Sequence, residues 1–262
     1  MFAAFVLIFI VAALAYRKRK LTKTGAFVAA IIANCIAVAF SYKGLFLLGT
    51  FFFSANALSF FKRKEHPAVS AIVAKGDCRD SMQVIANGGI PALLSILYIF
   101  FPSPALYCGF VASLAAVTAD TWASEIGTMF KQKPFHLWKW KRVPPGTSGA
   151  ITLFGTIAAL AGSFVISAIA IGLSAELFHQ SAYLLIAFTI AGFLGNVFDT
   201  VVGARFQVVY RCSVCGLETE RRMHCQRKTV HVSGVHWIDN DVVNLGCSIV
   251  GAILGISIGA FF

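Results

Sequence analysis

Long apolar runs with short polar connections between them make up most of this chain. Hydrophobic residues account for 58% of its 262 residues and charged residues for only 13%, whereas about 25% of a soluble domain is charged. A membrane-spanning helix needs about 20 mostly apolar residues, so this length allows roughly eight. We therefore expect one integral membrane domain over residues 1–262, with an all-α, polytopic fold. The spanning helices are predicted near 2–16, 25–41, 45–61, 84–101, 105–127, 149–173, 181–203 and 241–261.

The lysines and arginines orient these helices. When the apolar runs are drawn as eight crossings, only Lys43 of the 22 basic residues falls on the side opposite the others. Cytoplasmic loops are enriched in Lys and Arg, so both termini are expected outside and the protein is expected to be multi-pass, in the plasma membrane. The cytoplasmic loops are then predicted at 17–24, 62–83, 128–148 and 204–240. The net charge of +11 favours contact with anionic membrane lipids rather than nucleic acid.

Polar residues interrupt the apolar runs at their predicted cytoplasmic ends. Asn196 and Asp199 share one face of a helix, and a carboxylate within a spanning segment indicates function, the alternative being a hydrogen bond to a neighbouring helix. Asp120 and Glu125 lie in a second such stretch. With Asp241 these carboxylates could hold Mg²⁺, which prefers carboxylate and water oxygens together with substrate phosphates. The sequence therefore predicts Asp120, Asp199 and Asp241 as catalytic metal ligands and Glu125 as a further one.

Three more polar stretches suggest binding of phosphates. Lys75 and Arg79 precede a helix that carries Gln83 and Asn87 on one face. A Gly-rich turn with hydroxyl groups can present backbone amides to an anion, and otherwise acts as a hinge whose hydroxyls cap a helix. Asn240 and Asn244 open the last helix. The predicted substrate-binding residues are Lys75, Arg79, Gln83, Asn87, Thr147, Ser148, Gly149, Asn196, Asn240 and Asn244.

Two further features concern the loops. An Asp-Thr pair ends a helix at 120–121 and again at 199–200, and a basic loop follows each, which suggests a parallel internal repeat. In the loop 204–240, the Cys212-x-x-Cys215-Gly sequence is half of a common structural zinc site. His224 and Cys225 could supply the other ligands, and so could His231 or His236. The alternative is that these cysteines are reduced and bind no metal, as thiols in the cytoplasm are.

Taken together, these motifs resemble the integral membrane family called domain of unknown function 92. The resemblance rests on five ordered motifs: Arg79-x-Ser-x-Gln83 running into Asn87-Gly-Gly, Ala119-Asp-Thr-Trp-Ala-Ser-Glu125, Pro145-Gly-Thr-Ser-Gly149, Gly195-Asn-x-x-Asp-Thr200 and Asp239-Asn-Asp-x-Val-Asn244. This family includes the plant phytyl-phosphate kinase and the animal transmembrane protein 19. Membrane kinases of phytol, dolichol and diacylglycerol, several of which use CTP, are related more loosely.

The resemblance implies a magnesium-dependent membrane kinase. Such an enzyme would transfer a phosphoryl group from a nucleoside triphosphate of the CTP type to an isoprenoid monophosphate and give a prenyl diphosphate. A transporter or ion-coupled carrier would also need inward-facing polar residues. A lipid-binding protein without catalysis is a third reading. The depth of the polar residues separates the first two readings, since a carrier usually binds its cargo near the membrane midplane.

Overall fold

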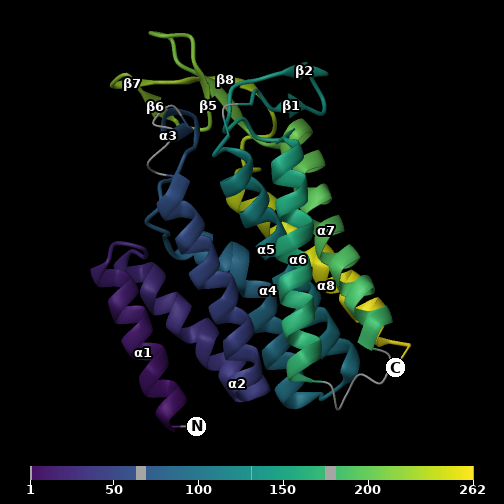
Figure 1. Ribbon diagram of the computed structural model, residues 1–262. Helices are drawn as coiled ribbons and strands as arrows, with labels where there is room; N and C mark the ends of the chain where they lie inside the picture. The colour runs from purple at the N-terminus through teal and green to yellow at the C-terminus, as the bar shows by residue number, and fades with distance from the viewer. Residues whose placement is uncertain (1, 63–68, 131, 175–180, 262) are drawn as a thin grey trace.

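The protein is a bundle of long helices with short strands gathered at one end (Figure 1). The computed structural model describes residues 2–62, 69–130, 132–174 and 181–261. Both ends of the chain lie toward the end of the bundle away from the strands (Figure 1). The helices are α1 (Phe2–Arg17), α2 (Lys23–Lys62), α3 (Val69–Ile72), α4 (Ser81–Phe100), α5 (Pro104–Gly127), α6 (Leu153–Leu173), α7 (Ser181–Phe206) and α8 (Asn240–Gly259).

Polar side chains fix where several of these helices begin. Asp80 forms a capping box with Gln83 at the start of α4, and Ser103, Thr152 and Asp239 accept backbone N–H groups at the starts of α5, α6 and α8. Each cap satisfies a donor that the first helical turn leaves unpaired. The α6 cap corrects the predicted start at 149, because the residues before Thr152 form a turn and a short strand instead.

The predicted helices at 25–41 and 45–61 are the two limbs of α2. The backbone of Ser41 is non-helical, with φ 53° and ψ −142°. A Cβ atom at Gly44 would lie 2.7 Å from Cγ2 of Ile36, although eight residues of straight helix span about 12 Å. The chain therefore reverses at Ser41, and the second limb returns toward the strands (Figure 1).

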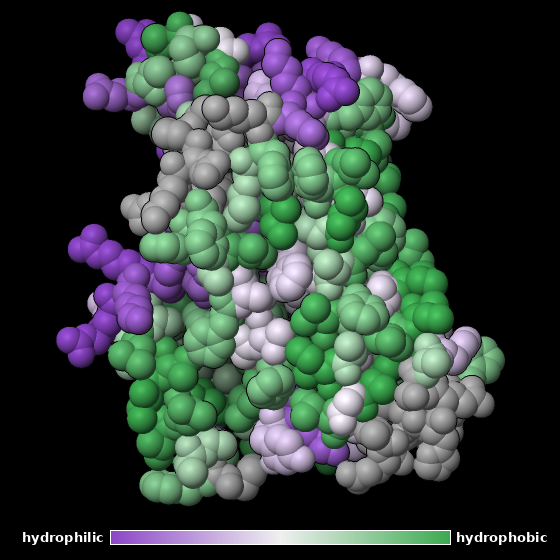
Figure 2. Space-filling model, viewed as in Figure 1, coloured by the Kyte–Doolittle hydropathy of each residue, from purple (hydrophilic) through white to green (hydrophobic). Residues whose placement is uncertain are grey.

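Six of the described helices are long and apolar enough to cross a membrane, with α2 counted once, and α1 is a shorter apolar helix. The multi-pass, mostly helical architecture is thus as predicted. The count of eight crossings, the outside position of both termini and the parallel repeat remain predictions. Figure 2 shows an apolar flank along the helices, with hydrophilic side chains at the strand-bearing end and near the connection between α1 and α2.

Helix α5 forms the centre of the bundle. It packs against α4, α6, α7, α8 and α2, and all of its residues from Tyr107 to Ala119 are buried. Glycines on α8 allow its close approach, because a Cβ atom at Gly255 would lie 2.4 Å from the carbonyl oxygen of Cys108. Backbones that approach this closely give good van der Waals packing between apolar helices.

Short strands in two of the predicted cytoplasmic loops, and just after the first of them, correct the all-α prediction. β1 (Phe135–His136), β2 (Lys141–Arg142) and β3 (Ala150–Ile151) form an antiparallel sheet in the order β2-β1-β3. β4 (Val209–Arg211), β5 (Glu218–Thr219) and β8 (Val230–Ser233) form another in the order β5-β4-β8. β6 (Met223–His224) and β7 (Arg227–Lys228) make a hairpin. Strands of two to four residues are too short to leave an alternating pattern in the sequence.

Candidate functional site

A cavity of about 1000 Å³ lies between α4, α5, α7 and the connections at the strand-bearing end. Its lining includes 13 of the 14 residues that the sequence suggested for magnesium and substrate binding, and only Asp241 of that set is not among the lining residues. The 13 are Lys75, Arg79, Gln83, Asn87, Asp120, Glu125, Thr147, Ser148, Gly149, Asn196, Asp199, Asn240 and Asn244. Five motifs that are far apart in the sequence thus meet at one site.

Close packing of α5 against α7 brings the two central carboxylates together. A Cβ atom at Gly195 would lie 2.6 Å from Cβ of Ala116, so only a glycine lets the helices approach this far. One helical turn beyond this contact, Asp120 on α5 and Asp199 on α7 interact directly through their carboxyl groups. The small residues of the sequence motif therefore set the position of its acidic residues.

One oxygen of the carboxylate pair and one oxygen of the nearby Asn196 amide lack hydrogen-bond partners among the described residues. Oδ2 of Asp199 and Oδ1 of Asn196 are buried and have no hydrogen-bond partner within the described part of the chain. Two neighbouring carboxylates that are both ionised repel each other, and a buried acceptor without a partner costs free energy. A hard cation such as Mg²⁺ takes oxygen ligands of this kind and would relieve both costs. The donor set at Asp120, Asp199 and Asn196 therefore fits a magnesium ion.

Asp241 occupies a different position from the other predicted metal ligands. It lies in the first turn of α8 and forms an ion pair with Lys75, which also lies 2.8 Å from Asp80. Burial lowers the pKa of Lys75, but its hydrogen bonds to Asp241 and Asp80 outweigh that effect and hold the pKa above its usual range. The Lys75 charge is thus shared between two carboxylates, and Oδ1 of Asp241 remains buried without a partner among the described residues.

The backbone of Arg79 is held by the connection between α1 and α2. Its carbonyl oxygen accepts the N–H of Thr22 at 3.0 Å, and its own N–H donates to the carbonyl of Lys20 at 3.0 Å. Burial lowers the pKa of the Arg79 guanidinium, and the nearby charges of Glu125 and Asp77 oppose that shift. The Arg79 side chain therefore extends into the cavity from a backbone held in place. It lies near Glu125, the residue predicted as a further metal ligand.

Gln83 and Asn87 present amides from the first turns of α4. The side-chain oxygen of Gln83 accepts the Asp80 N–H at 3.1 Å, and the Asn87 side-chain nitrogen donates to the Gln83 carbonyl at 3.1 Å. These contacts orient both amides. Gln83 and Arg79 both line the cavity.

The predicted phosphate turn is held against the end of α7. Gly149 has φ +70°, and a Cβ atom there would lie 2.2 Å from Cα of Ala204, so both its conformation and its packing require glycine. The Ser148 hydroxyl donates to Oε1 of Gln207 at 2.6 Å. Because α6 starts only at Leu153, the turn lies before β3 and not at a helix N-terminus as expected.

The sequence did not single out Glu220 and Arg221, which also line the cavity. Glu220 accepts the Gln207 amide at 2.7 Å and the Ala74 N–H at 3.2 Å. Burial raises the pKa of the Glu220 carboxyl from 4.5 to about 7, although these two hydrogen bonds act in the opposite direction. Its only sequence signal is an acidic residue within a basic loop. Asn56, an amide within an apolar run, could have been found by the rule that identified Asn196.

The four predicted zinc ligands lie outside this cavity lining. Cys212, Cys215, His224 and Cys225 come together within the loop 204–240, on β4 to β6 and the turns beside them. The sequence predicted the zinc ligands as a group separate from the magnesium- and substrate-binding residues, and the two groups are also separate in the structure.

Comparisons with known proteins identify the family of this chain. The family model described as integral membrane protein DUF92 matches residues 6–252. An uncharacterized membrane protein of Methanocaldococcus jannaschii is 31% identical over 98% of this chain and 94% of its own length. Protein PGR of Arabidopsis thaliana is 26% identical over 87% of this chain and 85% of its own length.

A second Arabidopsis thaliana protein, the chloroplastic protein VTE6, is 25% identical over 92% of this chain and 66% of its own length. No solved structure matches the chain. The family model spans nearly all of the sequence, including every motif that lines the cavity. The chain therefore belongs to the DUF92 family of integral membrane proteins.

Proposed function

We propose that this protein is a membrane kinase of prenyl phosphates, with a nucleoside triphosphate of the CTP type as its donor. The observation that carries the proposal is a second, apolar cavity beside the polar one. It has a volume of about 200 Å³ and lies between α1, α2 and α4. The two cavities share Arg79, Gln83 and Asn87. A ligand with an apolar tail and an anionic head would place its head at these three residues.

The apolar cavity suits an isoprenoid tail. Its walls include Ile8 and Ala33 in the packed layer between α1 and α2, and the aromatic residues at 51–53 on the second limb of α2. Burying apolar surface contributes about 0.8 kcal/mol for each CH₂ group. The binding free energy of a branched hydrocarbon chain would therefore increase with the length of chain buried there. Opposite the tail, the head group would meet the Arg79 guanidinium and the Gln83 amide, which donate hydrogen bonds to phosphate oxygens.

The polar cavity supplies the groups that phosphoryl transfer needs. This reaction depends on positioning and charge neutralisation more than on covalent chemistry. Asp120, Asp199 and Asn196 would hold Mg²⁺, which when bound neutralises phosphate charge and orients the phosphates. Arg79 and Arg221 would bind phosphate oxygens, and the backbone of the 147–149 turn would position the donor from the other side of the cavity.

A monophosphate acceptor agrees with the residues that line the cavity. Its phosphate would face Arg79 and Arg221, which both line the cavity. An alcohol must lose a proton when it attacks, whereas a phosphate oxygen is already anionic and needs no strong general base. In the proposed reaction an oxygen of the prenyl monophosphate bonds to the γ-phosphorus of the donor. The bond from that phosphorus to the β-γ bridging oxygen breaks, and a nucleoside diphosphate leaves.

The depth of the site favours a kinase over a carrier. Asp120 lies seven residues before the end of α5, and Asp199 lies seven residues before the end of α7. At 1.5 Å per residue, each carboxylate is about 10 Å from the strand-bearing end of its helix. A carrier would be expected to place its polar residues near the middle of helices of this length.

The proposal is tested with purified protein in lipid nanodiscs, γ-labelled CTP or ATP, Mg²⁺, and prenyl monophosphates with the matching alcohols. We expect labelled prenyl diphosphate from the monophosphates. Asp120→Asn and Asp199→Asn should abolish the transfer. Glu218→Gln should not, because Glu218 pairs with Lys139 and Arg211 outside the cavity lining. A folded protein that yields no labelled lipid with any donor and acceptor would overturn the proposal, and counterflow of a solute in proteoliposomes would support the carrier.

A further inference from the structure

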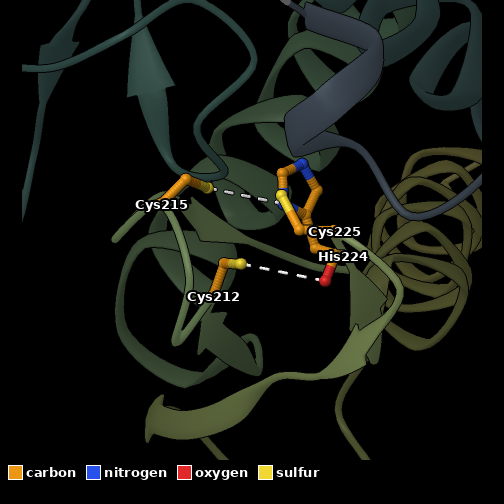
Figure 3. A group of neighbouring side chains, drawn as sticks. All are labelled: Cys212, Cys215, His224 and Cys225. Carbon is orange, nitrogen blue, oxygen red and sulfur yellow. Dashed lines mark hydrogen bonds between the residues drawn. The ribbon is translucent and has the colours of Figure 1, made fainter.

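The loop between α7 and α8 contains a compact group of three thiols and one imidazole. The ligand atoms of Cys212, Cys215, His224 and Cys225 all lie within 4.8 Å of one another. Nδ1 of His224 is 3.5 Å from Sγ of Cys215 and 3.2 Å from Sγ of Cys225. In Figure 3 the Cys215 sulfur points toward the His224 ring, and the Cys212 sulfur points toward the His224 carbonyl oxygen, 3.8 Å away. Ligand atoms of a tetrahedral zinc site are separated by about 3.5–3.8 Å, given zinc–sulfur bonds near 2.3 Å.

The first pair of cysteines lies on a turn suited to metal binding. Gly216 has φ +74°, and its N–H donates to the Cys212 carbonyl at 2.9 Å. The Val214 N–H points to Sγ of Cys212 at 3.4 Å. Hydrogen bonds of this kind orient a ligand and stabilise a thiolate. The Cys-x-x-Cys-Gly turn is therefore already arranged to present two sulfur atoms to one ion.

The second pair lies at a hairpin turn with an unusual backbone. β6 and β7 are joined by the two residues Cys225 and Gln226, whose φ angles are 49° and 59°. Such a turn prefers Asn-Gly, since both central residues need positive φ. Other residues are strained in this conformation and persist in it only where their surroundings hold them. A metal bound to Cys225 and to the adjacent His224 would hold this turn.

The loop has little apolar core that could replace a metal. Between 213 and 233, Thr219 is the single fully buried residue among those described, and most of the others are exposed. A segment that cannot bury apolar surface generally needs a staple such as a metal ion. Three thiolates and a neutral imidazole form one of the standard ligand sets for structural zinc.

This loop also forms one wall of the polar cavity. The Thr219 hydroxyl reaches the carbonyls of Ala71 and Ile72 at 2.9 and 2.8 Å, and the Arg221 side chain donates to the Val73 carbonyl at 2.9 Å. These bonds join β5 to the segment that leads to Lys75. Glu220, between them, lines the cavity. The fold of the loop therefore determines where this wall lies.

We propose that Cys212, Cys215, His224 and Cys225 bind one structural zinc ion, and that the ion holds the loop as a wall of the cavity. Zinc binds as Zn²⁺ to three thiolates and to Nδ1 of His224, so the three thiols release their protons when the ion enters. The proposal does not depend on kinase activity, because the zinc content of the protein can be measured even if the protein has no catalytic activity.

The test measures metals by mass spectrometry in the full chain, purified in detergent with an affinity tag that contains no histidine. We expect about one zinc per chain. Cys215→Ser should lose most of the zinc. His236→Ala should keep it, because this histidine of the same loop stacks on His231, 4.1 Å away, and is not one of the four ligands. Cobalt that replaces the zinc should show the absorption of a tetrahedral thiolate site.

A second measurement covers the case in which Cys215→Ser does not fold. In the wild-type protein, a chelator should remove the zinc and speed tryptic cleavage at Arg222, Arg227 and Lys228 by on the order of tenfold, because these exposed sites lie in the loop that the metal holds. Helical circular dichroism should change little. Iron in place of zinc, a disulfide between Cys212 and Cys215 without metal, or zinc that survives Cys215→Ser would each overturn the proposal.

Discussion

Asp120 on α5 and Asp199 on α7 interact through their carboxyl groups inside the polar cavity, one helical turn beyond the close contact between Ala116 and Gly195. Without a bound cation such a pair is destabilising when both groups are ionised, because the two negative charges repel each other. The same pair gives a cation strong charge compensation. Stability and metal binding are therefore linked at this site, and that linkage can be measured without knowing the substrate.

The first prediction concerns removal of one of these charges. Asp199→Asn should raise the midpoint of thermal unfolding in metal-free buffer, since it relieves repulsion between carboxylates. It should also abolish the stabilisation that added Mg²⁺ gives the wild-type protein, because bound ligand stabilises only a state that binds it. Phosphoryl transfer should fall by on the order of 100-fold or more. Unfolding scans with and without Mg²⁺ measure both stability effects, with Glu218→Gln as the control. An unchanged response of Asp199→Asn to Mg²⁺ would exclude Asp199 as a metal ligand.

The second prediction concerns the tail site. Gly49 lines the apolar cavity, and a Cβ atom there would meet only the ring of Phe53, at 3.8 Å or more. Gly49→Leu should therefore fit without backbone movement and occupy space meant for the lipid. We expect a higher KM for long prenyl phosphates and an unchanged KM for a five-carbon prenyl phosphate. Gly49→Ala, which adds one carbon, serves as the matched control. Equal effects of Gly49→Leu on long and short acceptors would place the tail elsewhere.

Much of this site could be predicted from the sequence, because its signals are local. An amide or carboxylate inside an apolar run is costly and therefore visible. Helical spacing alone places Asn196 and Asp199 on one face. The structure places 13 of the 14 residues predicted for magnesium and substrate binding in one cavity lining, and their roles in binding remain predictions.

The remaining features depend on contacts that no local pattern encodes. One partner of Lys75 is Asp241, 166 residues further along the chain. Residues paired over such a distance show no regular spacing in the sequence. Glu220 reaches the cavity only because β5 binds the segment after α3. The strands themselves are formed by two to four residues each. The start of α6 was misplaced because Thr152, and not Thr147 or Ser148, caps that helix.

The third prediction is a pH dependence that belongs to Glu220. Burial raises the pKa of its carboxyl from 4.5 to about 7, so between these values the folded state binds more protons than the unfolded state. The Glu220 contribution to stability therefore falls as the pH rises from 4.5 through 7. Glu220→Gln removes this titration and should make the unfolding temperature less sensitive to pH in that window.

The control for this pH dependence is Glu218, which lies two residues earlier in the same loop. Hydrogen bonds from Lys139 and Arg211 lower the pKa of its carboxyl, so its contribution has the opposite sign and is lost as the pH falls. The Glu218→Gln variant should therefore still lose stability as the pH rises to 7, and the loss should be as steep as in the wild-type protein or slightly steeper. Thermal unfolding in detergent from pH 5 to pH 8 separates the two variants. Identical pH profiles for Glu220→Gln and the wild-type protein would contradict the assignment.

The fourth prediction concerns the ion pair that closes the start of α8. The side chain of Asp241 is only 9% exposed and that of Lys75 is 34% exposed, so Lys75→Met would leave a nearly buried carboxylate close to Asp80 without its cation. Breaking a buried pair costs about 3–5 kcal/mol, and the exposure of Lys75 reduces the expected loss in the free energy of unfolding to about 1–2 kcal/mol.

Asp241→Asn combined with Lys75→Met should recover most of that loss, because the unpaired charge is then removed as well. A double-mutant cycle gives the coupling between the two residues. Lys139→Met is the matched control, since its partner Glu218 is at the surface, and it should cost at most about 1 kcal/mol. Two results would contradict this prediction: an equal loss in the free energy of unfolding for Lys75→Met and Lys139→Met, or no recovery of stability on adding Asp241→Asn. Lys75 would then not stabilise the start of α8 through Asp241, and its charge would be available to a phosphate.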